Sequence, residues 1–272
     1  GGHHPQPSGQ AGRLIRAAAA FAIAVAAAAP AGAVVILDST WREEGGSPAH
    51  PAAGFGAHIA FAHEDQFDAA VDFSTDGDTW GECSGTWIGN DASAGYVLTA
   101  AHCFNDGYTA KTYVYESEGG ALLVGDALFV HPEWSGSFDY RTGYDLAIVK
   151  LTAPVMDAGP QPLIYAGTKE KGRLLSFAGF GGRGIGSSGD QDAYYGFSNR
   201  WELKAAGQGV IDQVVEAITP MPKRRKDAGN YLGIFLPKED GSVSNPYGGS
   251  TKPATRLAGL LGSGDSGSGG WI

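Results

Sequence analysis

The sequence predicts an all-β protein, built as a barrel or a sandwich. Only 18% of the 272 residues are charged and 43 are glycines, while Val, Ile, Tyr, Phe and Trp are scattered along the chain. Short β-prone runs alternate with turn signals such as Asp76-Gly77-Asp78, a spacing that favours barrels and sandwiches over alternating strands and helices. The runs that we expect to form strands are residues 69–73, 86–88, 96–98, 112–115, 127–130, 146–151, 174–178 and 231–236.

Length and charge limit the function classes. The chain is long enough for one large domain or two modest ones, and 43% hydrophobic residues indicate a globular rather than a disordered protein. The formal net charge is −10. Since binding to phosphates needs a concentrated positive surface, this charge argues against nucleic acid as a partner.

The N-terminal part has the order of features typical of an export signal. Arg13 and Arg16 precede an apolar, alanine-rich block that is too short for a membrane span, and small residues follow it up to Ala33. We therefore predict upstream residues and a signal peptide over 1–33, with cleavage after Ala33 and a secreted or periplasmic product. The alternative is an alanine-rich buried helix, which does not explain the order of charge, apolar block and small residues.

The only two cysteines are Cys83 and Cys103. Export would permit a disulfide, whereas two free buried thiols would be normal in a cytosolic protein. Residues 34–56 follow the signal and are rich in Pro and Gly, so we expect an extended leader there.

Three stretches carry residue types suited to nucleophilic catalysis. Thr99–Cys103 ends an apolar run in small residues and a histidine, and Asp145–Leu151 opens an apolar strand with a carboxylate. Gly262–Gly269 holds a serine among glycines, which permit a tight backbone path with converging N–H groups. Hydrolysis by a serine needs a hydroxyl, an imidazole, a carboxylate and fixed N–H donors, and these stretches could supply all four.

Each of these residues alone has a simpler interpretation. His102 would be a core histidine, Asp145 a strand-end cap and Ser266 part of a linker. An α/β-hydrolase elbow does not fit, because Ser268 occupies the last glycine position of that motif.

Other polar and glycine-rich patterns are read as structural. The run Gly179–Gly184 fits a dinucleotide-binding pattern, but no helix follows it, so we expect a surface loop up to Gly189. His58 and His63 match no common metal-ligand spacing, so we interpret them as surface residues and expect no metal site.

Together the three stretches resemble the trypsin/chymotrypsin family of serine proteases. The histidine motif of that family is intact in Thr99–Cys103, and its aspartate motif matches Asp145–Leu151. Its nucleophile motif matches Gly264–Gly267, followed by Ser268 where a second glycine is usual. The resemblance runs from about residue 67 to the end, in the family's order of His, Asp and Ser.

The resemblance implies a fold of two six-stranded antiparallel Greek-key barrels within a protease domain over 57–272. The first barrel would span about 57–160 and the second about 161–272. Members of the family continue well past the nucleophile, so we expect the second barrel to be incomplete in this chain and any membrane association to depend on a further C-terminal region.

The resemblance also implies the roles of the site residues. Ser266 would be the nucleophile, His102 the general base and Asp145 the group that orients His102. The amides of Gly264 and Ser266 would bind the oxyanion, and Cys83 and Cys103 would form a disulfide.

The expected function is a secreted serine endopeptidase that acts on proteins or peptides through an acyl-enzyme, without a cofactor. In the family that the chain resembles, the floor of the substrate pocket lies six residues before the nucleophile. The resemblance therefore implies Leu260 at that place, where it would favour apolar side chains over cationic ones. The resemblance also implies that Asp265, the acidic residue just before the nucleophile, pairs with a free N-terminal amine, for which we expect Val34. The alternative function is a catalytically silent, protease-like binding module.

Overall fold

The computed structural model describes residues 32–136, 144–191, 200–215 and 231–272. The signal peptide predicted over 13–33 therefore lies almost entirely outside the described residues. Among the helices that the structure describes, none has the length and apolar character needed to cross a membrane.

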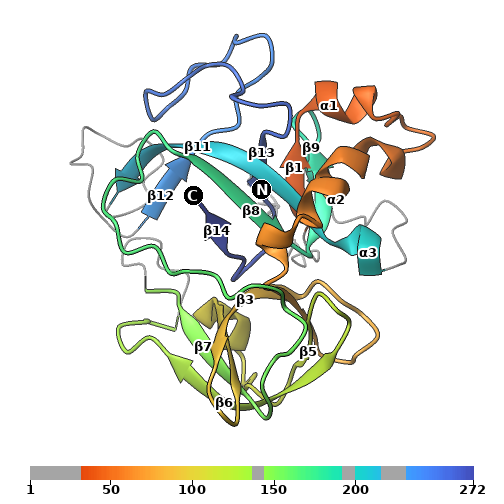
Figure 1. Cartoon of the computed structure of the whole chain (residues 1–272). Coiled ribbons are helices and arrows are strands. Elements are labelled where there is room, and N and C mark those ends of the chain that lie inside the picture. The colour runs from red at the N-terminus through yellow and green to blue at the C-terminus, as the bar shows by residue number, and fades with distance from the viewer. Residues whose placement is uncertain (1–31, 137–143, 192–199, 216–230) are drawn as a thin grey trace, which may run out of the picture.

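The first half is a closed, six-stranded antiparallel barrel in the order β2-β3-β4-β7-β6-β5, at the bottom of Figure 1. Its strands are β2 (Ala70–Ser74), β3 (Cys83–Asn90), β4 (Gly95–Thr99), β5 (Val114–Glu116), β6 (Leu122–Val130) and β7 (Ala147–Leu151). Every second residue of β4 and β7 is buried, as expected for strands with one face toward a barrel interior. Phe73 and Tyr115 are fully buried in this core.

The second half contains two four-stranded sheets, with strand orders β12-β11-β8-β14 and β10-β9-β1-β13. The first has β8 (Leu174–Gly179), β11 (Ala205–Val215), β12 (Tyr231–Ile234) and β14 (Gly270–Trp271). The other has β1 (Gly32–Ile36), β9 (Gly182–Ile185), β10 (Gly189–Gln191) and β13 (Gly259–Leu261). Within the described residues these strands do not close into a barrel. The incomplete second barrel expected from the sequence remains a prediction. The expected domain boundary near residue 160 falls between β7 and β8 and remains a prediction.

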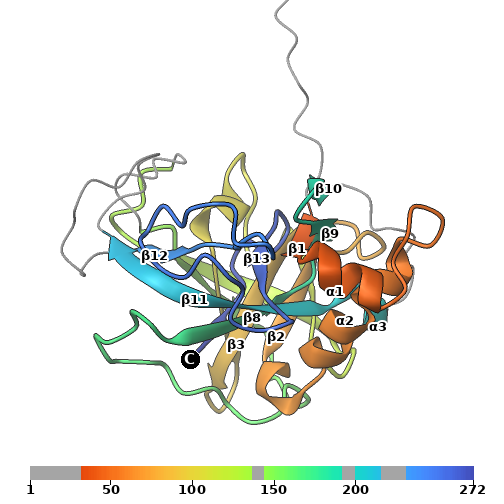
Figure 2. The same ribbon diagram turned by 90° about the horizontal axis from the view of Figure 1, so that it is seen from above.

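Residues 34–56 are not the extended leader that we expected. They include most of β1, the helix α1 (Asp38–Glu43) and the 3-10 helix η1 (Ala52–Phe55), and α2 (Gly56–Ala62) follows directly. Figure 2 shows α1 and α2 beside β1 and β9. The segment folds because Val34, Ile36 and Phe55 are fully buried in the core of the second half.

The glycine-rich run from Gly179 is not the surface loop that we expected either. It forms β9 and β10, which pair antiparallel, and β9 also pairs in parallel with β1. A side chain at Gly184 would overlap the carbonyl of Gly189, so glycine permits the close approach of these two strands. The remaining short helices are η2 (Asp65–Phe67), η3 (Ala101–Phe104) and α3 (Arg200–Leu203).

Candidate active site

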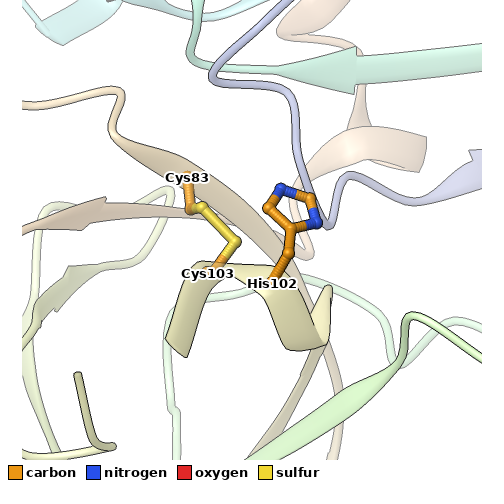
Figure 3. Close-up of side chains that lie close together, drawn as sticks. All are labelled: Cys83, His102 and Cys103. Atoms are coloured by element: carbon orange, nitrogen blue, oxygen red, sulfur yellow. A yellow bond between two sulfur atoms is a disulfide. The ribbon is translucent and has the colours of Figure 1, made fainter. Parts of the chain in front are cut away.

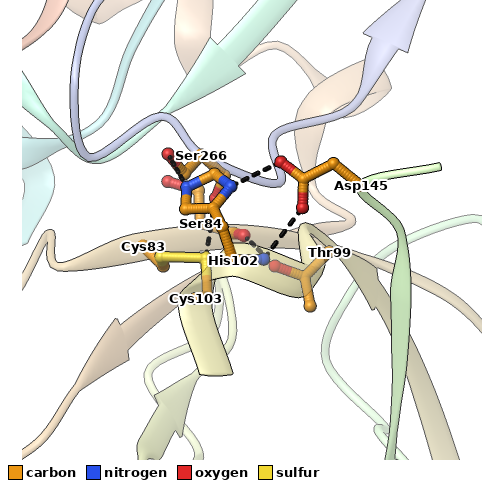
Figure 4. A network of polar contacts seen from close by, with 7 residues as sticks. All are labelled: Cys83, Ser84, Thr99, His102, Cys103, Asp145 and Ser266. Carbon is orange, nitrogen blue, oxygen red and sulfur yellow. Dashed lines mark hydrogen bonds and ion pairs between the residues drawn. A yellow bond between two sulfur atoms is a disulfide. The ribbon is translucent and has the colours of Figure 1, made fainter. Parts of the chain in front are cut away.

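The structure brings His102, Asp145 and Ser266 together, although they are far apart in sequence. His102 lies in η3 just after β4, Asp145 lies two residues before the start of β7, and Ser266 lies in the turn between β13 and β14. Nδ1 of His102 is 2.6 Å from Oδ2 of Asp145, and Nε2 is 2.7 Å from Oγ of Ser266. Figure 4 shows this continuous hydrogen-bonded chain.

Asp145 holds both the ring and the backbone of His102. Its Oδ1 accepts a hydrogen bond from the His102 amide at 2.8 Å, in addition to the contact of Oδ2 with the ring. Burial alone would raise the pKa of the Asp145 carboxyl, but the hydrogen bonds from His102 outweigh it and lower that pKa. The carboxyl is therefore held in the ionised form that fixes the imidazole with its proton on Nδ1.

The loop that carries Ser266 needs glycine at two positions. Gly264 and Gly267 have φ angles of +86° and +88°, which side chains disfavour. A Cβ at Gly267 would also overlap the hydroxyl of Thr99 and the carbonyl oxygen of Ser84. Within the described part of the chain, the amides of Gly264 and Ser266 donate to no acceptor. Their role as oxyanion donors remains a prediction.

Cys83 and Cys103 form a disulfide that connects β3 to η3, with their Cα atoms 6.4 Å apart. His102 lies next to it in Figure 3, and one ligand-type atom from each of the three side chains falls within 4.8 Å of the others. Because the sulfurs are bonded to each other, they are not available as thiolate ligands for a metal. The bridge instead braces the helical turn that presents the imidazole.

Asp265 precedes Ser266 and is buried, with 3% of its surface exposed. Its Oδ2 accepts a hydrogen bond from the Gly262 amide at 3.1 Å. Burial raises the pKa of this carboxyl to about 7, although backbone hydrogen bonds and the charge of Arg183 act in the opposite direction. Val34, the predicted partner, lies within β1 and aligns with Leu261 and Arg183. The pairing of a Val34 amine with Asp265 remains a prediction.

Leu260, the predicted pocket floor, lies in β13 and is half-buried, with Val35 opposite it on β1. Its role in a pocket remains a prediction. A groove of about 880 Å³ also opens beside Asp145, between the two halves. Apolar side chains, among them Leu163, Ile164 and Trp271, line much of it.

Sequence reasoning missed Ser84, which contacts the loop of Ser266 from the first barrel. Its amide donates to the carbonyl of Ser266 at 2.8 Å, and its hydroxyl donates to the carbonyl of Gly264 at 2.9 Å. The only signal for it in the sequence is its position next to Cys83, which says nothing about a partner 180 residues away.

A closed antiparallel barrel that holds an Asp–His–Ser chain at its edge is the arrangement of the trypsin-like serine proteases. The trypsin family model matches residues 56–201, which is more than half of the chain. The chain belongs to the trypsin family.

Similar proteins agree with this family. Chymotrypsin-C of Rattus norvegicus is 35% identical over 86 residues, which cover 29% of this chain and 30% of the relative. Chymotrypsin-C of Mus musculus is 34% identical over 86 residues, with the same coverage of 29% and 30%. The chain thus matches less than a third of the length of these curated relatives.

Two solved protease structures match parts of the chain. Neuropsin of mouse brain has a TM-score of 0.39 and 15% identity, with 53% of this chain and 59% of that chain covered. The VesB protease of Vibrio cholerae has a TM-score of 0.35 and 22% identity, with 53% of this chain and 42% of that chain covered.

Proposed function

We propose that this protein is a secreted serine endopeptidase with Ser266, His102 and Asp145 as its catalytic triad. The observation that carries the proposal is the unbroken hydrogen-bonded chain from Asp145 through His102 to Ser266, with separations of 2.6 and 2.7 Å. Membership of the trypsin family supports it and points to protein or peptide substrates.

The proposed reaction follows from the positions of these atoms. Oγ of Ser266 attacks the carbonyl carbon of the substrate while its proton moves to Nε2 of His102, and Asp145 stabilises the resulting imidazolium. The amides of Gly264 and Ser266 receive the negative charge that develops on the carbonyl oxygen. His102 then protonates the leaving amine, which leaves an acyl group on Ser266, and a water molecule activated by His102 hydrolyses that ester.

Export and substrate preference belong to the same proposal. The disulfide between Cys83 and Cys103 suits an oxidising compartment, which supports export by a signal over 13–33. Leu260 cannot pair with a cation, so we propose a preference for apolar side chains before the cleaved bond.

A fluorophosphonate probe, which reacts with activated serines, tests the proposed function on the full-length protein. We expect labelling of Ser266 and its complete loss in Ser266→Ala. A folded protein that cleaves no peptide and takes up no probe would instead identify the chain as a catalytically silent binding module.

A further inference from the structure

We propose that the hydroxyl of Ser84 is a positioning group for the oxyanion-binding loop, an inference that rests on the proposed function. Ser84 is the second residue of β3 and belongs to the first barrel, whereas the loop over Gly262–Gly269 belongs to the second half. A single buried serine therefore joins the two parts of the molecule at the proposed nucleophile (Figure 4).

Ser84 holds the loop at two carbonyl groups. Its backbone amide donates to the carbonyl of Ser266 at 2.8 Å, and its Oγ donates to the carbonyl of Gly264 at 2.9 Å. These two residues also carry the proposed oxyanion donors. The first barrel thus holds the carbonyl groups of Gly264 and Ser266, the same residues whose N–H groups are proposed to bind the substrate.

The direction of the Ser84 hydroxyl is set by a third contact. The amide of Phe180, at the end of β8, donates to Oγ of Ser84 at 3.2 Å. Because an amide N–H can only donate, the hydroxyl proton is left for the carbonyl of Gly264. The backbone carbonyl of Ser84 accepts a hydrogen bond from the hydroxyl of Thr99 at 2.8 Å. The backbone of Ser84 is therefore held in place as well as its side chain.

Burial makes this arrangement difficult to replace. Ser84 has no exposed surface, so without its hydroxyl the carbonyl of Gly264 and the amide of Phe180 would lose a partner at a site closed to solvent. Gly264 has a φ of +86° and no side chain to restrain it. The carbonyl of Gly264 belongs to the peptide unit before Asp265, and the proposed donor N–H belongs to the unit before Gly264. The two units meet at the Cα of Gly264, so once the carbonyl is released this glycine can change both φ and ψ and turn the donor N–H away from the oxyanion.

An effect of this kind appears in the transition state rather than in substrate binding. The oxyanion forms only during the reaction, and its donors must lie about 2.7–3.1 Å away from it. We expect Ser84→Ala to lower kcat about tenfold or more in the full-length protein, with KM changed by less than about twofold. The affinity for a peptidyl boronic acid, which mimics the tetrahedral intermediate, should fall by a factor similar to kcat.

Ser74→Ala is the matched control. Ser74 is also a fully buried serine of the first barrel, and its hydroxyl donates to Asp76 at 3.1 Å and accepts from the Gly77 amide at 2.8 Å. These partners lie in a turn away from the loop of Ser266. We expect Ser74→Ala to lower the melting temperature but to leave kcat and boronic acid affinity unchanged per folded molecule, with folding checked by near-ultraviolet circular dichroism.

Ser84→Thr keeps the hydroxyl and should recover part of the kcat that Ser84→Ala loses. An active wild type in which Ser84→Ala and Ser74→Ala have the same kcat and the same boronic acid affinity would overturn the positioning role alone. A loss in Ser84→Ala that lies only in KM would also overturn it. A folded wild type that neither cleaves peptides nor reacts with the probe would overturn the proposed function first, and this inference with it.

Discussion

Asp145 makes two hydrogen bonds to His102, one to the ring and one to the backbone amide. In Asp145→Asn the side-chain amide would place a donor against Nδ1, so the ring would carry its proton on the nitrogen that faces Ser266. We expect kcat to fall about 10⁴-fold, the loss measured for the corresponding change in the Ser-His-Asp template. Steady-state cleavage of a small peptide ester measures it.

The double variant Asp145→Asn/Ser266→Ala provides a check on this first prediction. Residues that act as one unit lose activity non-additively, so the double variant should be no slower than Ser266→Ala alone. Additive losses would indicate that Asp145 acts separately from Ser266.

Asp265 gives a second prediction at the scale of a residue. It applies to the chain that still carries residues before Val34, in which Val34 has no free amine to pair with Asp265. Burial raises its pKa from the ordinary 3.8 to about 7. The folded state therefore keeps a proton on Asp265 at pH values where the unfolded state has released it. The resulting contribution to the free energy of unfolding is fully present below pH 3.8 and is lost as the pH rises through 7. We expect the free energy of unfolding to decrease between pH 5 and pH 8 relative to Asp265→Asn, measured by urea denaturation. A difference that does not change with pH would contradict the prediction.

At the scale of the secondary-structure elements, the turn between β13 and β14 fits against β3 and β4 without space for a side chain. A Cβ at Gly267 would overlap Thr99 and Ser84, whereas one at Gly107 would meet nothing within 4 Å. Both glycines have positive φ angles, +88° and +90°. A comparison of alanine substitutions at Gly267 and Gly107 therefore separates the effect of steric overlap from the effect of backbone strain at positive φ.

We expect Gly267→Ala to abolish peptide cleavage and to lower stability by more than about 3 kcal/mol, because the loop must move away from the barrel. Gly107→Ala should cost only about 1 kcal/mol and leave kcat unchanged. Thermal unfolding and peptide cleavage measure both variants. Equal effects would show that strain at positive φ, and not contact with the barrel, controls this turn.

The disulfide joins β3 to η3 across a sequence separation of 20 residues. In the loop-entropy model, removing such a bridge costs about 3 kcal/mol of stability. We expect the double variant Cys83→Ser/Cys103→Ser to lose about this amount in urea denaturation and to show a lower kcat, because η3 carries His102. The reduced wild type is its control and should show the same loss.

At the scale of the whole molecule, a buried ion network joins the two halves. Lys204 lies just before β11 and is fully buried, and its Nζ contacts Oε2 of Glu118, between β5 and β6, at 2.6 Å. His63, which follows α2, contacts Oε1 of Glu118 with Nδ1 and the carbonyl of Trp201 with Nε2, both at 2.8 Å. The side chain of His63 therefore connects Glu118 of the first barrel to the segment of Trp201 in the second half.

Burial would raise the pKa of Glu118, but hydrogen bonds and the charges of His63 and Lys204 lower it to about 2. The stability from its ionised form is therefore present above its ordinary pKa of 4.5 and is lost as the pH falls toward 2. Glu118→Gln would leave the ammonium of Lys204 buried without this partner, at a cost of about 3–5 kcal/mol at pH 7. Urea denaturation measures this cost.

Asp126→Asn is the matched surface control for Glu118→Gln. Asp126 is 47% exposed and lies 3.8 Å from Nζ of Lys150, so its replacement should cost less than about 1 kcal/mol. Similar costs at the two positions would show that the buried network does not hold the halves together.

Much of the first barrel could be predicted from the sequence. The expected runs at 69–73, 86–88 and 96–98 coincide with parts of β2, β3 and β4. These runs are rich in β-branched and aromatic residues and are bounded by turn signals, which are local features of the sequence. The second half was predicted less well, since β1, β9, β10, β11, β13 and β14 were not expected. Several of these strands are short or glycine-rich and acquire their order from distant partners.

Buried polar residues could not be predicted either. His58, interpreted as a surface residue, is fully buried on α2, with Nδ1 2.7 Å from the carbonyl of Ala206. Burial lowers the pKa of its ring to about 4. A polar side chain becomes a core residue only when a specific partner reaches it, and this partner lies 148 residues away.

The sequence by itself determined the family, the strands β4 and β7 beside His102 and Asp145, and the residues proposed to carry the chemistry, because these depend on residue types at fixed local spacing. Only the tertiary structure decided that residues 34–56 fold into the second half, that Ser84 contacts the loop of Ser266, and that Lys204 meets Glu118. Each of these depends on burial of groups that are distant in the chain, and a partner more than 80 residues away leaves no periodic signal in the local sequence.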